Sequence, residues 1–135
     1  MRFVFAKKMR YFIEVNSRSA ILTAPDAGVR AIVAHELTHV TDYARGKRLH
    51  LFGLLRLTNK NFREGFENRA DTEAVKRGYA TGLKEYRLWL YERVPAKALA
   101  EKRMDYLSPD EIDALARAYD SEPSSARRGL FAPSK

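Results

Sequence analysis

The chain has 135 residues, of which 45% are hydrophobic and 31% are charged, with a formal net charge of +8. This length fits one globular domain, and the composition excludes collagenous and wholly disordered chains. Because the chain has no cysteine, disulfides, thiol nucleophiles and cysteine-ligated metal sites are excluded as well. Lys and Arg are spread along the chain and form no specific nucleic-acid motif, which favours a solvated basic surface over a nucleic-acid interface.

The sequence predicts neither a signal peptide nor a membrane-spanning segment. In residues 1–8 the apolar run is too short for the middle region of a signal peptide. No stretch approaches the roughly 18 consecutive apolar residues that a membrane-spanning helix requires. We therefore expect a cytoplasmic protein without a transmembrane segment.

The first elements in the chain are predicted to be strands. Residues 2–6 and 10–15 are rich in aromatic and β-branched side chains, which predicts a hairpin that turns at Lys7 and Lys8. A third short strand is expected at residues 20–23. A short helix for part of this region is the alternative.

A helix is expected next. Pro25 and Asp26 are typical of a helix start, with Thr23 or Asp26 as the cap, and Gly46 is typical of a helix end. At about 100° per residue, the apolar side chains of this helix fall on one stripe, which we expect to face the core. The stripe consists of Val29, Val33, Leu37, Val40 and Ala44.

Two histidines follow one another at helical spacing within this segment. His35 and His39 lie one turn apart, and Glu36 comes directly after the first of them. This HExxH pattern is typical of zinc metallopeptidases, in which the histidines bind the ion and the glutamate takes a proton from its water. The histidines share a face with Asp42 beside the apolar stripe, which favours ligands facing a cleft over histidines satisfied within the core.

The apolar stretch at residues 49–57 follows this helix. We expect it to pack over the domain core, although a lid, a substrate-contacting loop or a membrane-touching segment would fit the same pattern. His50 within it is a candidate donor to the transition state only if it folds back to the cleft.

A second helix is predicted from the capping signal at residues 61–64 to about Arg77, before Gly78. Glu67 and Asp71 share one face of it with small residues that permit close helix packing. Carboxylates buried on such a face require partners, which a metal at Glu67 and an imidazole N–H at Asp71 would supply. An ordinary solvated acidic face is the alternative. The small residues are Ala70, Ala74 and Gly78.

Together the two helices resemble those of the gluzincin metallopeptidases, in which HExxH is followed by a separate helix that carries Glu-x-x-Ala-Asp. The matching stretches, HELTH at residues 35–39 and ENRAD at residues 67–71, lie within about residues 19–80. By this resemblance His35, His39 and Glu67 would bind Zn²⁺, and Glu36 would be the general base. The chain would then be a minimal, single-domain member of that group.

The resemblance also implies roles around the ligands. Asp71 would hold a ligand histidine, namely His35, and Asp42 would be a further supporting carboxylate. Glu64 is the alternative third ligand if the register of the second motif differs. Residues 19–23 would be the strand that binds an extended substrate. Neither the metzincin extension, which needs Gly at 42 and His at 45, nor the cysteine ligand of a peptide deformylase is present.

The remainder of the chain reads as helical. Helices are predicted within residues 83–93, from Pro95 to about residue 104, and from Ser108, whose apolar face carries Ile112. One tyrosine is expected to donate to the developing oxyanion, a role that zincins often give to Tyr, His or Arg. The candidates are Tyr79, Tyr86, Tyr91, Tyr106 and Tyr119.

The sequence thus predicts an α+β, zincin-like fold, with a small N-terminal β-sheet packed on the HExxH helix and a mostly helical C-terminal part. Residues 1–120 would form one catalytic domain and residues 121–135 a flexible tail. The predicted function is zinc-dependent hydrolysis of peptide bonds in a peptide or protein substrate, with the C-terminal segment as a candidate inhibitor of its own cleft. The alternatives are a non-catalytic zincin-like module that binds a partner peptide, and a basic adaptor for nucleic acid or membrane surfaces.

Overall fold

The computed structural model describes residues 10–16, 18–44 and 60–121. In these ranges 81% of the residues are helical and none belongs to a β-strand. The predicted N-terminal sheet is therefore wrong for the described part of the chain, which is all-α. The elements are the 3₁₀ turn η1 (Ala20–Thr23), α1 (Asp26–Ala44), α2 (Lys60–Ala74), the π-helical turn η3 (Val75–Tyr79), α3 (Ala80–Tyr91), α4 (Ala96–Asp105) and α5 (Pro109–Ser121).

Some predicted features lie outside the described residues. These are the strand at 2–6, the helix end at Gly46, the apolar stretch at 49–57 with His50, and the tail beyond Ser121.

Local hydrogen bonds of polar side chains replace the expected strand pairing before α1. The Asn16 side chain accepts from the backbone N–H of Arg18 at 2.9 Å, and the Ser19 hydroxyl accepts from Ile21 at 3.3 Å. Thr23 donates to the carbonyl of Ala20 at 2.8 Å. Such short-range bonds compete with strand formation, and here they fold residues 20–23 into the turn η1. The predicted substrate-binding strand at 19–23 is therefore wrong.

Helix α1 begins directly after Pro25, whose carbonyl accepts from Val29 at 2.9 Å, so neither Thr23 nor Asp26 occupies the predicted cap position. Its buried face also differs from the predicted apolar stripe. Val33 and Leu37 are 39% and 49% exposed, whereas the buried side consists of small and polar residues. These residues are Gly28, Ala31, Ala34, His35, Thr38 and Asp42.

Small residues on α1 and α3 explain this choice of face, because they let the two backbones approach closely. A Cβ atom added to Gly82 would lie 2.2 Å from the carbonyl oxygen of Ala27, and one added to Gly28 would lie 3.1 Å from the Tyr86 Cβ. The predicted stripe carries valine and leucine, which would hold α3 further away. Close backbone packing therefore outweighs the burial of the larger side chains.

Helix α2 buries the predicted face as far as Ala74, whereas Gly78, the last residue assigned to that face, lies in η3 and is exposed. Ala70, Asp71 and Ala74 are each no more than 1% exposed. The helix continues through η3, where Gly78 has a φ of +90° that a residue with a side chain rarely adopts. Gly78 thus marks the change of direction into α3, as the predicted helix end indicates.

The last two helices are also found where the sequence predicts them. Pro95 precedes α4, and α5 is preceded by a capping box in which Ser108 and Glu111 bond reciprocally. The Glu111 carboxylate accepts from the Ser108 backbone at 2.8 Å, and the Ser108 hydroxyl accepts from the Glu111 N–H at 3.3 Å.

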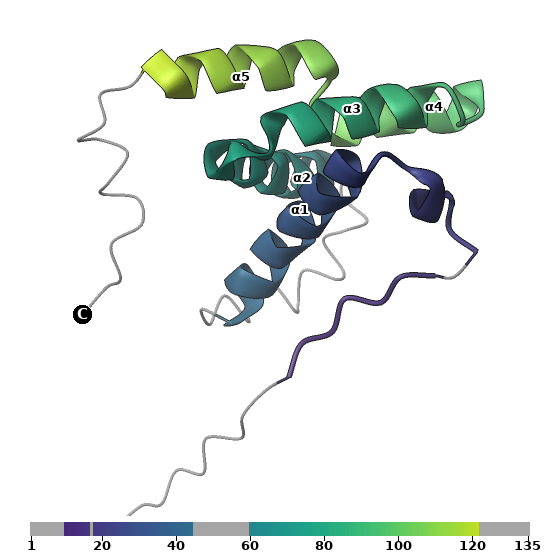
Figure 1. Ribbon diagram of the computed structural model, residues 1–135, viewed down its shortest axis with the longest axis horizontal. Helices are drawn as coiled ribbons and strands as arrows, with labels where there is room; N and C mark the ends of the chain where they lie inside the picture. The colour runs from purple at the N-terminus through teal and green to yellow at the C-terminus, as the bar shows by residue number, and fades with distance from the viewer. Residues whose placement is uncertain (1–9, 17, 45–59, 122–135) are drawn as a thin grey trace, which may run out of the picture.

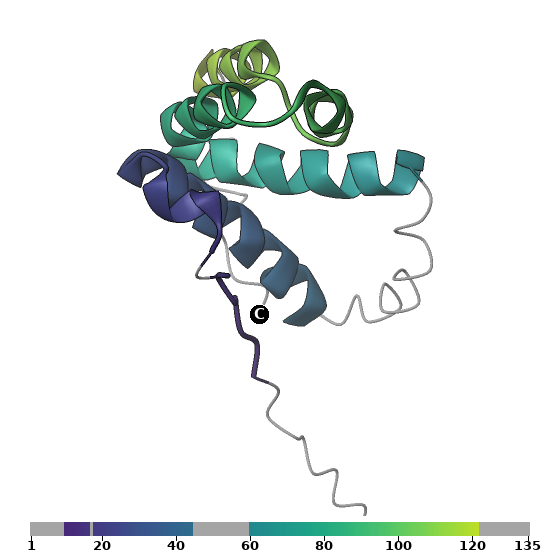
Figure 2. The same cartoon turned by 90° about the vertical axis from the view of Figure 1, so that its right-hand side faces the viewer.

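The helices form a small bundle in which α1 contacts both α2 and α3. In Figure 2, α2 lies across the molecule, with α1 below it and α3, α4 and α5 above it. Helix α5 packs against α3, and the two lie side by side at the top of Figure 1. The two helices that carry the predicted site, α1 and α2, are therefore neighbours.

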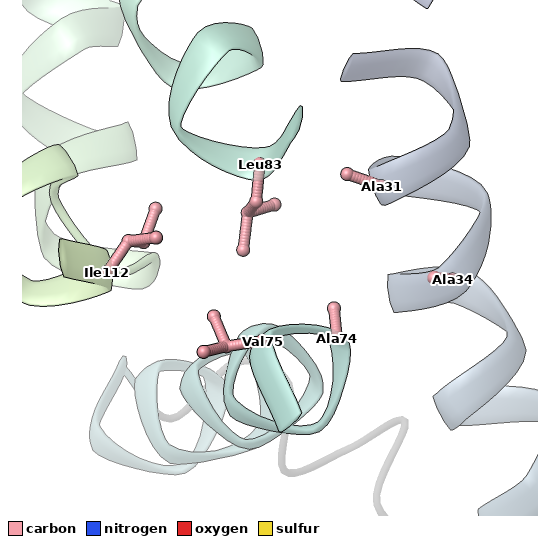
Figure 3. Packing of buried hydrophobic residues seen from close by; sticks show 6 residues of the cluster. All are labelled: Ala31, Ala34, Ala74, Val75, Leu83 and Ile112. Carbon is pink, nitrogen blue, oxygen red and sulfur yellow. The ribbon is translucent and has the colours of Figure 1, made fainter. Parts of the chain in front are cut away.

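An apolar cluster joins four of the helices. Leu83 from α3 and Ile112 from α5 are fully buried, and Leu83 points toward Val75 and Ala74 (Figure 3). The cluster consists of Ala31, Ala34, Ala74, Val75, Leu83 and Ile112. Within the part of the chain that the structure describes, no helix combines the length and apolar character needed to cross a membrane.

Candidate metal centre

The two histidines of α1 and the first carboxylate of the α2 motif meet between the helices. His35 Nε2 lies 3.0 Å from Glu67 Oε2 and 3.2 Å from His39 Nε2, and His39 Nε2 lies 3.5 Å from Glu67 Oε2. His35, His39 and Glu67 form a group that could hold a metal ion. The structure therefore brings together the three ligands that the sequence predicts.

The size of this triangle matches the ligand spacing of a tetrahedral site. Zinc ligands lie about 2.0–2.1 Å from the ion, so two tetrahedral ligands are separated by about 3.3 Å. The three observed separations, 3.0, 3.2 and 3.5 Å, fall on either side of this value. These side chains therefore need little movement to accept an ion, and three ligands leave a fourth position for water or substrate.

The second carboxylate of the α2 motif contacts the far side of the first ligand. Asp71 Oδ1 accepts from His35 Nδ1 at 2.8 Å, which leaves His35 Nε2 directed toward Glu67 and His39. A carboxylate on one ring nitrogen fixes the orientation of a metal-binding imidazole and increases its basicity. Asp71 thus occupies the position that the sequence predicts for it.

Asp71 is fully buried and is stabilised by partners that the sequence analysis missed. Arg87 from α3 donates to its two oxygens at 2.9 and 2.8 Å, and the backbone N–H of Leu107 donates to Oδ2 at 3.0 Å. Arg87 itself is only 3% exposed. We call His35, Asp71 and Arg87 the polar cluster; it connects α1, α2 and α3 through charged hydrogen bonds.

A signal for Arg87 was present in the sequence. Arg87 lies four residues after Leu83 and three before Leu90, so it shares their face of α3. A cation on an apolar helix face requires a buried anion as its partner. Asp71, which the sequence predicts to be buried on α2, is the anion that Arg87 contacts.

The proximity of these charges shifts the pKa values of His35 and Glu67. Burial alone would lower the pKa of His35, but hydrogen bonds to Asp71 and Glu67, together with their charges, raise it to about 9. Burial alone would raise the pKa of Glu67, but hydrogen bonds from His35 and His39 lower it to about 2. A metal ion must displace the proton shared by this group, so its binding competes with protonation.

The remaining predicted site residues have other surroundings. His39 stacks on the Phe66 ring with a centroid separation of 4.2 Å, which fixes its orientation toward His35. Asp42 accepts two hydrogen bonds from Arg69 at 2.6 and 2.8 Å, so its observed partner is Arg69 on α2 instead of a ligand histidine. Glu64 is exposed and lies outside the ligand group, which Glu67 completes.

The predicted base lies between two hollows in the surface. A groove of about 1090 Å³ between α1 and the segment before it is lined by Glu36 and His39 together with apolar side chains. A smaller pocket of about 170 Å³ is lined by His35 and Glu36 on one side and by residues of α3 and α4 on the other. Among the described residues, none forms a hydrogen bond or an ion pair with the Glu36 carboxylate, which is thus available to a water molecule.

The structure also reduces the number of tyrosines that are candidates to donate a hydrogen bond to the oxyanion. Of the five, Tyr86 and Tyr106 line the smaller pocket. The Tyr106 ring lies 5.9 Å from the ring of His35, measured between centroids. Burial raises the pKa of both tyrosines, which therefore remain neutral hydrogen-bond donors at physiological pH.

No protein family, curated protein or solved structure matches this chain. The function of the protein is therefore inferred from the geometry of the site and from the motifs that form it.

Proposed function

We propose that this protein is a zinc-dependent peptidase of the gluzincin type. The main support is the triangle formed by His35 Nε2, His39 Nε2 and Glu67 Oε2, whose sides match tetrahedral ligand spacing. The carboxylate of Asp71 on the far side of His35 and the unpaired carboxylate of Glu36 beside the groove add to it. Two nitrogen donors and one carboxylate, with a fourth position open, suit a catalytic zinc ion.

In this proposal His35, His39 and Glu67 hold the ion, and Asp71 keeps the His35 ring oriented. Bound zinc supplies positive charge that polarises the scissile carbonyl and lowers the pKa of water to about 7. Glu36 accepts a proton from the attacking water and then delivers it to the leaving amine. The groove beside Glu36 and His39 gives the substrate access to these groups.

The test is a set of three proteins, namely the wild type, Glu67→Ala and Glu36→Gln, each loaded with zinc and assayed on a peptide library. We expect about one zinc ion per wild-type chain, loss of zinc from Glu67→Ala, and wild-type zinc content in Glu36→Gln. Hydrolysis should fall by about 100-fold or more in Glu36→Gln, because general base catalysis contributes at least that factor.

Two results would contradict the proposal. Zinc content that does not change in Glu67→Ala would exclude Glu67 as a ligand. Full zinc content without hydrolysis of any peptide by the wild type would favour the non-catalytic metal-binding module instead.

A further inference from the structure

The smaller pocket beside the metal centre contains a positive charge, that of Lys102, which the proposed reaction does not use. Lys102 from α4 and Arg87 from α3 both line it, together with Tyr86, Tyr106 and Glu36. Both cations lie close to the ring of Tyr106. Arg87 Cζ is 4.5 Å from the ring centroid, and Lys102 Nζ is 5.0 Å from it.

The two cations differ in how they are partnered. Arg87 is bound to Asp71, although its buried Nε has no hydrogen-bond acceptor. Lys102 is half-buried, and within the described ranges no carboxylate lies close enough to pair with it. A partly desolvated ammonium group without an anion is unfavourable, so this position favours a negatively charged ligand.

The pocket also contains neutral hydrogen-bond donors. In the described part of the chain, the hydroxyls of Tyr86 and Tyr106 take part in no hydrogen bond with protein. Glu36, from α1, is the one carboxylate among the described residues that line the pocket, whereas Arg87 and Lys102 come from α3 and α4. Lys102, which has no ion-pair partner within the described ranges, and the two phenols therefore make this pocket a site for a carboxylate.

The volume of the pocket limits what can enter it. A volume of about 170 Å³ corresponds to about five or six water molecules at about 30 Å³ each. That space suits one amino-acid residue and excludes an extended chain. The adjacent groove is several times larger and shares Glu36 with the pocket.

We propose that this pocket is the carboxylate subsite of the protein, in which Lys102 binds an anionic group of the substrate next to the scissile bond. The inference builds on the proposed peptidase function and identifies its substrate class as peptides that end in a free carboxylate or carry an acidic side chain there. The rest of the peptide lies in the groove on the other side of Glu36.

Binding is the first test, because it does not depend on turnover. The metal-free full-length protein is titrated with an acetylated dipeptide as the free acid and as the C-terminal amide, and binding is followed by NMR. The wild type and Lys102→Arg should bind the acid at least about tenfold more tightly than the amide, as expected for a charged hydrogen bond. Lys102→Met should lose this preference, whereas Lys97→Met, which removes the same charge from an exposed position on α4, should keep it.

The two sources of the carboxylate are separated with the zinc-loaded protein. One pair of peptides differs only in a C-terminal acid or amide, and a second pair, both amidated, differs in Glu or Gln as the last residue. Selective cleavage within the first pair identifies a terminal carboxylate, and selectivity within the second identifies an acidic side chain.

The outcomes for the subsite and for the reaction are distinct. Equal binding of acid and amide by the wild type, together with no preference for the Glu peptide over the Gln peptide, would overturn the subsite, and so would an acid preference that persists in Lys102→Met. Hydrolysis without selectivity in either pair would leave the peptidase function intact and refute the subsite. Acid-selective binding through Lys102 without any hydrolysis would support the subsite and refute the peptidase function.

Discussion

The interior of the bundle contains two regions that are stabilised in different ways. The apolar cluster around Leu83 and Ile112 gains stability in proportion to the area that it removes from water, at about 25 cal/mol per Å². The polar cluster of His35, Asp71 and Arg87 gains little net stability from burial, because desolvation offsets the attraction between its charges. It persists only when every member has its partner. The comparison suggests that the apolar cluster maintains the fold and that the polar cluster maintains the site.

The largest effect is expected from breaking the polar cluster. Asp71→Ala should lower the free energy of unfolding by about 3–5 kcal/mol, because it leaves the Arg87 charge buried without its anion. Urea denaturation of the metal-free protein measures this change. The matched control is Glu73→Ala on the same helix, whose half-exposed carboxylate pairs with Lys76 and Arg77 at 3.5 Å and should cost less than about 1 kcal/mol.

A double substitution sharpens this test. Asp71→Leu combined with Arg87→Met removes both charges at once, and it should be more stable than Asp71→Ala alone. If Asp71→Ala lowers the free energy of unfolding by no more than Glu73→Ala does, the polar cluster is not a buried charge network.

A somewhat smaller loss of stability is expected from a substitution in the apolar cluster. Leu83→Ala removes a fully buried side chain and should lower the free energy of unfolding by about 3 kcal/mol, within the range observed for such truncations.

The zinc affinity of Leu83→Ala, measured by competition with a chelator under folded conditions, should stay near the wild-type value. Asp71→Asn should instead bind zinc about 10–100-fold more weakly, because it disturbs the carboxylate on His35. Equal losses of zinc affinity in the two variants would contradict the division between the clusters.

The pH dependence of the metal-free protein provides a further comparison. The pKa of His35 is raised from 6.5 to about 9 in the folded state, so its protonated ring stabilises the fold fully below pH 6.5. This contribution should be lost as the pH rises from 6.5 through about 9. Urea denaturation at pH 6 and pH 9.5 measures the loss, which should be absent in His35→Gln. Zinc affinity should rise over the same interval, because zinc competes with the proton.

The helices of the C-terminal half and the ligand set could be predicted from short-range patterns. The HExxH and Glu-x-x-Ala-Asp spacings place each group of side chains on one helix face, which needs no knowledge of the rest of the fold. The capping box at Ser108 and the glycine at position 78 are equally local signals. The meeting of the two motifs was expected from the partners that buried Glu67 and Asp71 require and from the resemblance to a known pair of motifs.

The remaining features depended on packing between segments that are distant in sequence. The aromatic and β-branched residues at 10–15 match a strand, but strand propensity is decided by partners, and the described residues offer none. The apolar stripe of α1 was assigned to the core by hydrophobicity, whereas close contact between Gly82 and Ala27 selects the small and polar face. The contacts of Arg87 and Lys102 with the surroundings of the site likewise follow from where α3 and α4 pack.

The smallest effect on stability is expected from the capping box that precedes α5. Ser108→Ala removes the hydroxyl that accepts from the Glu111 N–H and should cost about 1 kcal/mol. Ser121→Ala at the other end of α5 is the control, because its hydroxyl donates to a carbonyl and caps no N–H group. Thermal denaturation of the two variants and the wild type measures the difference.

The same capping box should also make the stability of the fold depend on pH. Hydrogen bonds from the backbone and hydroxyl of Ser108 lower the pKa of Glu111 below its ordinary 4.5, so the ionised carboxylate stabilises the fold above pH 4.5. This contribution is lost as the pH falls below that value. Because Ser108→Ala removes one of the two donors, the stability difference between it and the wild type should shrink as the pH falls below 4.5. A difference that does not change with pH would show that the hydroxyl acts on the helix N–H alone and not on the carboxylate.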